Sequence, residues 1–299
     1  MGRIKLLASL LLLATATGCN QAADAQTTPS ATPQASEQIG QGEPYQMSGT
    51  QVWTVPDTLE GRSYQVYVAL PAGYEDTPQR RYPVLYVTDA HYAFPIVRQL
   101  SRRMNLDGPV IRDHILVGLS YAVDDDPVRS RTRDYTPSAR RNAAKGAEGG
   151  GPSYQAWLKS SAIPFVESKF RTDQNQRVLL GHSFGSLLAT QILFSDPDMF
   201  SHYVLGSPSL WFNGHQMFER EAAYAAANTD LKAKIYMYIG AEEVGRYDMV
   251  GDNRRLEQAL LSRNYPSLEL KSDVISAEDH LTVAPIGFMR ALETLLPAQ

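Results

Sequence analysis

The residues best suited to chemistry form one short motif, Gly181-His182-Ser183-Phe184-Gly185. It follows the apolar run 178–180 and precedes a helix-like stretch that begins at Ser186. A sharp turn between a strand and a helix exposes a serine hydroxyl, and flanking glycines remove the Cβ atoms that would clash there. The positive N-terminal end of the helix would also stabilise a developing oxyanion. We therefore predict that Ser183 is a nucleophile, rather than part of a simple glycine-bounded turn.

A serine nucleophile needs a general base, and histidine is the side chain that most often serves. On such a turn the nucleophile, the acid and the histidine follow one another along the chain in that order. His202, His215 and His280 lie beyond Ser183. His202 begins an apolar strand and is expected to be structural, while His215 lies in a predicted surface loop. His280 follows the strand-like run 267–275 and precedes the last helix, so we predict that it is the base.

The acid of a catalytic triad should follow the predicted strand 234–239, within reach of the histidine. Glu242 and Glu243 both qualify, and Asp248 is more remote. We favour Glu243, because a residue three positions after Gly240 turns back over the end of the strand. Two alternatives remain open at this point: a solvated acidic loop, and a serine–histidine dyad that works without an acid.

An oxyanion hole needs two backbone amides that point at the same place. Phe184 supplies one amide, because it directly follows the nucleophile. The second should come from the loop after the predicted strand 83–88. We predict that it is the amide of His91.

The pattern of apolar residues predicts the elements that position these side chains. The runs 51–55 and 62–70 alternate as half-exposed antiparallel strands do. Short apolar blocks predict strands buried on both faces, at 83–88, 114–120, 177–181, 203–206 and 234–239. Helical patterns follow at 95–104, 154–170, 184–194, 252–263 and 283–296, with Pro95 in a first turn and Pro164 splitting its helix. This order predicts an α/β fold, a mostly parallel sheet with helices on both faces.

The segment 121–152 interrupts this alternation. It is polar and rich in glycine, which predicts a long insertion at the end of a strand, of the kind that forms lids or binding loops. Its run Gly149-Gly150-Gly151 is not a phosphate-binding loop, because no Lys-Ser/Thr follows it and no strand precedes it.

The first 19 residues have the pattern of an export signal. Arg3 and Lys5 precede the apolar stretch 6–14, which is too short to span a bilayer. Small residues then lead to Cys19, the only cysteine, so no disulfide can form within the chain. We predict a lipoprotein signal at 1–18 and a lipid anchor on Cys19 that holds the protein to a membrane in the periplasm or cell envelope. The alternative is plain signal cleavage beside an incidental cysteine.

Composition then divides the rest of the chain. Residues 19–48 are rich in Ala, Thr, Gln, Pro and Ser and predict a flexible tether, while 49–299 form one domain. The formal net charge is −4 over 299 residues, which argues against nucleic acid as a partner. The histidines are scattered and lack zinc-site spacing, so no metal and no cofactor is expected.

Five motifs taken in order resemble the putative-esterase family of the α/β-hydrolase superfamily. They are Tyr82–Asp89, Arg133–Pro137, Gly181–Gly185, Ser207–Trp211 and Asp279–Val283. The resemblance is strongest to siderophore trilactone esterases, with esterase D and S-formylglutathione hydrolase as further relatives. It implies an α/β-hydrolase fold, Ser183 as nucleophile, His280 as base, the turn Asp89–His91 in the oxyanion hole, and an ester substrate such as a siderophore lactone. Feruloyl or acetyl esters of polysaccharide are the alternative substrates, and a non-catalytic binding protein of this fold is the alternative function.

Substrate contacts are expected from the insertion and from Trp211. Arg129, Arg131 and Arg133 would suit an anionic acyl group or a catecholate, and Trp211 could stack on a ring. We select Arg129, Arg133 and Trp211 as candidates. The alternative is that Arg133 forms a structural ion pair with Asp134 and that Trp211 caps the core.

Overall fold

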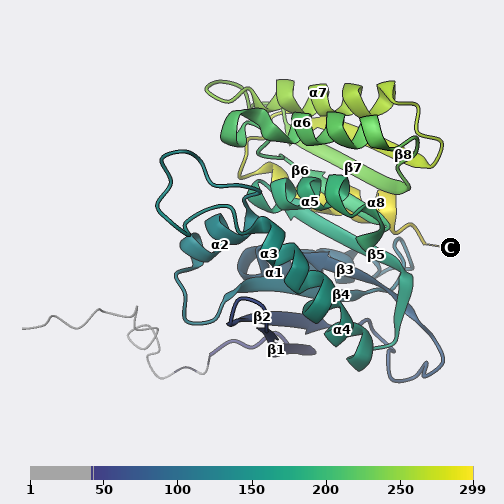
Figure 1. Ribbon diagram of the computed structural model, residues 1–299. Helices are drawn as coiled ribbons and strands as arrows, with labels where there is room; N and C mark the ends of the chain where they lie inside the picture. The colour runs from purple at the N-terminus through teal and green to yellow at the C-terminus, as the bar shows by residue number, and fades with distance from the viewer. Residues whose placement is uncertain (1–41, 43, 299) are drawn as a thin grey trace, which may run out of the picture. The chain divides into compact units, whose positions relative to one another are not determined.

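An eight-stranded sheet lies at the centre of the domain, with the strand order β1-β2-β4-β3-β5-β6-β7-β8 (Figure 1). β1 pairs with β2 and β2 with β4 in antiparallel register, and every other pairing is parallel. The strands are β1 Thr50–Asp57, β2 Arg62–Ala69, β3 Tyr82–Val87, β4 Ile115–Ala122, β5 Thr172–His182, β6 His202–Gly206, β7 Ala233–Gly240 and β8 Leu268–Ile275. The predicted mostly parallel sheet with antiparallel N-terminal strands is confirmed.

The computed structural model describes residue 42 and residues 44–298, and residues from Met47 onward form one unit. The predicted signal, Cys19 and most of the predicted tether lie outside the described residues. Within the described range, no helix has both the length and the apolar character needed to cross a membrane.

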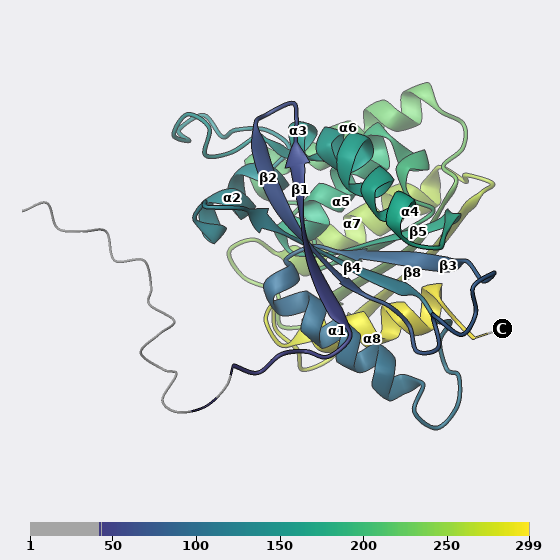
Figure 2. The ribbon, with the colours of Figure 1, turned by 90° about the horizontal axis from the view of Figure 1, so that it is seen from below.

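Two hydrophobic layers hold helices against the two faces of the sheet. α1 (Ala90–Met104) and α8 (Val283–Leu295) cover one face, which they share with buried side chains such as Leu85 and Val178 (Figure 2). The opposite face is covered by α3 (Gly151–Trp157), α4 (Ile163–Lys169), α5 (Phe184–Ser195), α6 (Phe212–Ala227) and α7 (Met249–Ser262). Burial of strands on both faces explains why they appear in the sequence as short continuous apolar blocks.

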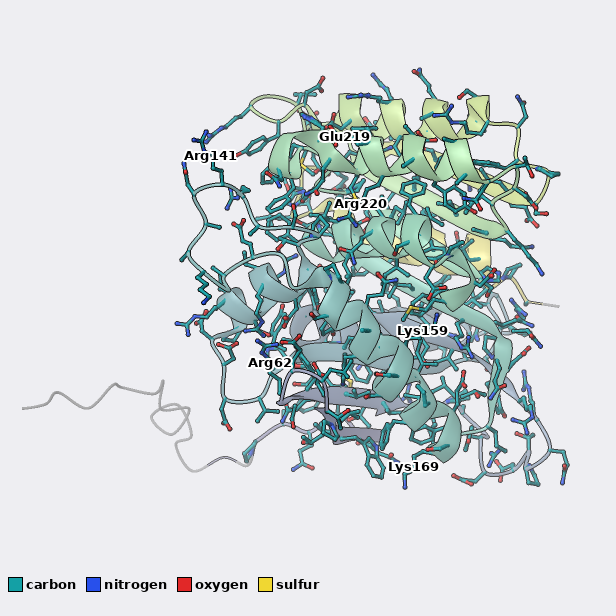
Figure 3. All side chains as sticks on the ribbon, viewed as in Figure 1. Arg62, Arg141, Lys159, Lys169, Glu219 and Arg220 are labelled. Carbon is teal, nitrogen blue, oxygen red and sulfur yellow. The ribbon has the colours of Figure 1, made fainter. Side chains whose placement is uncertain are left out.

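The helices follow the predicted pattern on their buried sides. In the stretch that contains α3 and α4, Trp157 and Val166 are fully buried, while Lys159 and Lys169, labelled in Figure 3, are exposed. A π-helical turn at Leu158–Ala162 separates the two helices, and Pro164 is the second residue of α4. Pro164 has no N–H to donate, so the break that its position predicts is confirmed.

The structure differs from the prediction at the start of one helix and by two helices that the sequence pattern does not indicate. α1 begins at Ala90, so Pro95 lies inside the helix rather than in its first turn. The buried side chains of Ala90, Ala93 and Phe94 pack against the sheet, and this packing outweighs the one backbone hydrogen bond that Pro95 removes. The insertion contains the helix α2, Pro127–Tyr135, and the helix α6 was not predicted at all.

The carboxyl ends of the parallel strands bring the candidate residues to one edge of the sheet. Asp89 follows β3, Ser183 follows β5, Ser207 follows β6, Glu243 follows β7 and His280 follows β8. Ligands of open parallel sheets bind at this edge, where loops from neighbouring strands converge.

Candidate active site

Ser183 occupies the turn between β5 and α5 at positive φ, with φ 60° and ψ −121°. A Cβ on Gly181 would lie 2.4 Å from the backbone carbonyl carbon of Gly185, and a Cβ on Gly185 would lie 2.1 Å from Thr88 Oγ1. Both positions therefore require glycine. The strain of a non-glycine residue at positive φ is typical of a functional turn that the surrounding structure holds in place.

Glu243 and His280 form a short hydrogen bond, with 2.6 Å between Glu243 Oε2 and His280 Nδ1. The other oxygen, Oε1, accepts hydrogen bonds from Ser207 Oγ at 2.6 Å and from the Gly240 amide at 2.9 Å. Burial opposes ionisation of Glu243, but the hydrogen bonds from His280, Ser207 and Gly240 outweigh it and hold the pKa below its ordinary value. Glu243 is thus a buried carboxylate that fixes the orientation of the His280 ring.

His182 connects the His280 loop to the turn that carries Ser183. Its Nε2 lies 2.9 Å from the His280 carbonyl oxygen, its Nδ1 lies 3.1 Å from the Tyr238 hydroxyl, and the two imidazole rings are 4.8 Å apart. A carbonyl only accepts, so Nε2 donates and Nδ1 accepts from Tyr238. Burial, with a smaller contribution from His280, lowers the pKa of His182 to about 4. His182 is therefore a neutral link between nucleophile and base, a role that the sequence pattern did not reveal.

The turn Ser207-Pro208-Ser209 contacts both halves of the candidate site. Ser207 has φ 39° and donates its hydroxyl hydrogen to Glu243, while Ser209 Oγ lies 3.4 Å from Ser183 Oγ. Ser207 and Ser209 are both buried. The structure thus brings Ser183, Glu243 and His280 to one place, and direct contact between the Ser183 hydroxyl and His280 stays a prediction.

The two residues whose amides are predicted to form an oxyanion hole, His91 and Phe184, lie at the N-terminal ends of α1 and α5. Asp89 has φ 54°, and its carbonyl accepts from the amides of Tyr92 and Ala93, so the His91 amide precedes the first hydrogen bonds of α1. Phe184 is the first residue of α5. The His91 imidazole contacts Ser120 Oγ at 2.9 Å, so this side chain is held by β4.

The carboxylate of Asp89 is fully buried and paired with Arg131 from α2. Arg131 Nε and Nη2 donate to Asp89 Oδ1 and Oδ2 at 2.8 and 3.0 Å, and the Tyr121 hydroxyl donates to Oδ1 at 2.7 Å. The Arg131 guanidinium carbon also lies 5.3 Å from the centroid of the Phe184 ring. The insertion is therefore tied to the predicted oxyanion turn by a bidentate ion pair, which the sequence analysis did not select.

Replacing Arg131 with Met is expected to lower the free energy of unfolding by about 3 kcal/mol, because it leaves a buried carboxylate without its counter-charge. Urea denaturation followed by circular dichroism measures this change. Arg129→Met is the matched control, since Arg129 lies on the same helix with 69% of its side chain exposed. The control should change stability by less than about 0.5 kcal/mol. Equal stability of the Arg131→Met and Arg129→Met proteins would contradict a structural role for the pair.

The candidate substrate contacts lie in different surroundings. Arg129 is exposed, with Asp125 at 3.8 Å. Arg133 is buried and bonds to Asp134 at 2.7 Å and to Asp125, so the ion pair of the alternative interpretation is present. Trp211 is half-buried, stacks on Tyr247 with 4.0 Å between ring centroids, and lies 6.1 Å from the Phe184 ring. Among these three residues, Trp211 is the one that approaches the turn of the predicted nucleophile, through its contact with the Phe184 ring.

The other histidines beyond Ser183 have partners away from the serine turn. His202 is buried beside Ser201, and His215 contacts Asp252 at 3.0 Å. Burial lowers the pKa of His202 to about 4, which keeps it neutral. No cluster of three or more His, Cys, Asp or Glu side chains suited to a metal ion occurs among the described residues.

The sheet order, the strained serine between β5 and α5, and the loops after β7 and β8 define an α/β-hydrolase fold. The chain belongs to the family described as "Putative esterase", whose model matches residues 58–267. It is an esterase-family protein, as its motifs predicted.

Individual relatives agree with this assignment. The chain is 25% identical over 272 residues to ferri-bacillibactin esterase BesA of Bacillus subtilis (strain 168), covering 86% of this chain and 93% of that protein. It matches the crystal structure of the BES protein from Bacillus cereus with a TM-score of 0.76 and 24% identity, over 87% of this chain and all of the other (100%). An IroE-like serine hydrolase from Shewanella oneidensis matches with a TM-score of 0.70 and 23% identity, over 82% of this chain and 79% of that one. The predicted resemblance to siderophore esterases is confirmed.

Proposed function

We propose that the protein is a serine esterase that cleaves carboxylic esters of siderophores through an acyl-enzyme. The observation that carries this proposal is the Glu243–His280 hydrogen bond of 2.6 Å, held by His182 beside the strained Ser183 turn. A buried carboxylate, an oriented imidazole and a partly exposed hydroxyl are the three groups that nucleophilic acyl transfer needs. The substrate class is supported by the relative in Bacillus subtilis, which is named for a ferri-siderophore.

The proposed reaction has two halves. Ser183 Oγ attacks the ester carbonyl carbon while His280 Nε2 takes the hydroxyl proton, and Glu243 accepts from Nδ1 of the resulting imidazolium. The amides of Phe184 and His91 donate to the oxyanion. His280 then gives its proton to the leaving alkoxide oxygen, the C–O bond breaks, and the alcohol departs. Water activated by His280 attacks the acyl-serine, which releases the carboxylic acid and restores Ser183.

Covalent labelling tests the nucleophile directly. Incubation of the purified domain with a fluorophosphonate probe is expected to add one label, located on Ser183 by mass spectrometry of peptides, because such probes react with activated serines. Bacillibactin, with and without iron, should be opened to linear hydrolysis products. An unlabelled, folded domain that still binds the siderophore would favour a non-catalytic binding protein. Labelling with cleavage of feruloyl esters alone would keep the mechanism and replace the substrate.

A further inference from the structure

A cavity of about 320 Å³ lies beside the Glu243–His280 pair. Its lining comes from the loop 242–249 after β7 and from 279–281 after β8. Apolar side chains on this lining are exposed to an unusual degree: 63% for Val244, 40% for Tyr247 and 82% for Leu281. Apolar groups gathered at the mouth of an active site mark a surface that a ligand covers.

An aromatic stack stiffens one wall of this cavity. The Tyr247 ring is stacked on Trp211 with an interplanar angle of 15°, and the Arg246 guanidinium lies 5.1 Å from the Tyr247 ring centroid. Tyr247 is thus an oriented aromatic side chain that still has exposed surface. Such a wall favours a flat ring as its ligand, because stacked rings gain energy beyond the area that they bury.

The charges around the cavity favour a ring without a negative charge. Glu242, Asp248 and Asp279 line it along with Arg246, so acidic groups outnumber basic ones. Asp248 accepts a hydrogen bond from the Gly251 amide in the first turn of α7, and Asp279 accepts from the amides of Leu281 and Thr282. The amides of Thr282 and Leu281 hold the pKa of Asp279 below its ordinary value, and this mostly acidic lining would repel an anionic ligand.

The place of His280 decides which half of an ester this cavity would hold. In the proposed reaction His280 gives its proton to the leaving oxygen, so the alcohol half must lie on the side of its ring. His280 and Glu243 themselves line the cavity, whereas Phe184 and His91, which carry the proposed oxyanion amides, belong to α5 and α1 and are not part of its lining. We propose that this cavity is the subsite for the alcohol half of the ester, and that Tyr247 and Leu281 select an alcohol that carries an uncharged aromatic ring. The inference rests on the proposed serine esterase function.

Two isomeric esters separate the halves of the substrate. Benzyl acetate carries its ring on the alcohol, and methyl phenylacetate carries the ring on the acid. Tyr247→Ala and Leu281→Ala are each expected to lower kcat/KM for benzyl acetate by about 10-fold, mainly through KM, as loss of apolar binding contacts does. The same variants should change kcat/KM for methyl phenylacetate by less than about twofold. Leu59→Ala is the matched control, because Leu59 is 68% exposed in the turn between β1 and β2.

The outcomes distinguish a failure of this inference from a failure of the proposed esterase function. An equal loss on both isomers, or a larger loss on methyl phenylacetate, would overturn the assignment of the cavity to the alcohol half. If the Tyr247→Ala and Leu281→Ala proteins hydrolyse both esters as fast as the wild-type protein does, the inference is overturned and the proposed esterase function stands. A wild-type protein that cleaves no ester at all would overturn the proposed function and the inference with it.

Discussion

Ser183→Ala is expected to lower kcat for ester hydrolysis by about 10⁵-fold or more, because a methyl group cannot form the acyl-enzyme. Rates of p-nitrophenyl acetate cleavage at saturating substrate measure this loss, corrected for spontaneous hydrolysis. The substitution leaves the turn itself in place, since alanine and serine meet the same steric demand at φ 60°. Fluorophosphonate labelling should disappear along with the activity.

Ser209→Ala is the matched control for this substitution. The Ser209 hydroxyl lies 3.4 Å from the Ser183 hydroxyl. Removing it therefore changes the immediate surroundings of Ser183 but keeps the predicted nucleophile. We expect the Ser209→Ala protein to keep its fluorophosphonate labelling and to lose less than about 30-fold in kcat, the order of one ordinary hydrogen bond. If Ser183→Ala retained as much activity as Ser209→Ala, Ser183 would not be the nucleophile.

The fold could be predicted where apolar periodicity and turns agreed. The buried strands β3 to β7 appear as short apolar blocks, and Pro164 marks the break between α3 and α4 at the position that its missing N–H dictates. α2 escaped prediction because its residues are mostly charged or polar, and its helical start depends on the Asp126 side chain, which caps the Arg129 amide. α6 escaped because Phe212 is followed by Asn213, Gly214 and His215, residue types that predict a loop and that adopt positive φ here.

The site could be predicted only as far as residue type and chain order carry information. The offset from Gly240 favours Glu243 over Glu242, and in the structure the Gly240 amide donates to the Glu243 carboxylate. The supporting contacts of His182, Ser207 and Arg131 are long-range pairings between loops of different strands. No local pattern encodes these distances, so they required the three-dimensional arrangement of the sheet edge.

Glu243→Gln is expected to lower kcat by about 10⁴-fold with little change in KM, as loss of the triad acid does in serine proteases. A glutamine amide can donate to His280 Nδ1, which places the imidazole proton on Nε2 and removes the acceptor that Ser183 needs. The low pKa of Glu243 means that the wild-type carboxylate is ionised throughout the neutral range, so this loss should persist from pH 6 to pH 9. Steady-state kinetics across that range measure it.

Glu242→Gln supplies the comparison, because Glu242 is the adjacent residue, carries the same charge and is exposed. Its substitution should leave kcat within about twofold of wild type, since an exposed carboxylate is screened by water and salt. A Glu243→Gln protein as active as Glu242→Gln would show that Ser183 and His280 work as a dyad. In that case the buried carboxylate would serve only to hold the His280 loop against Ser207 and Gly240, and its loss would appear in the free energy of unfolding instead of in kcat.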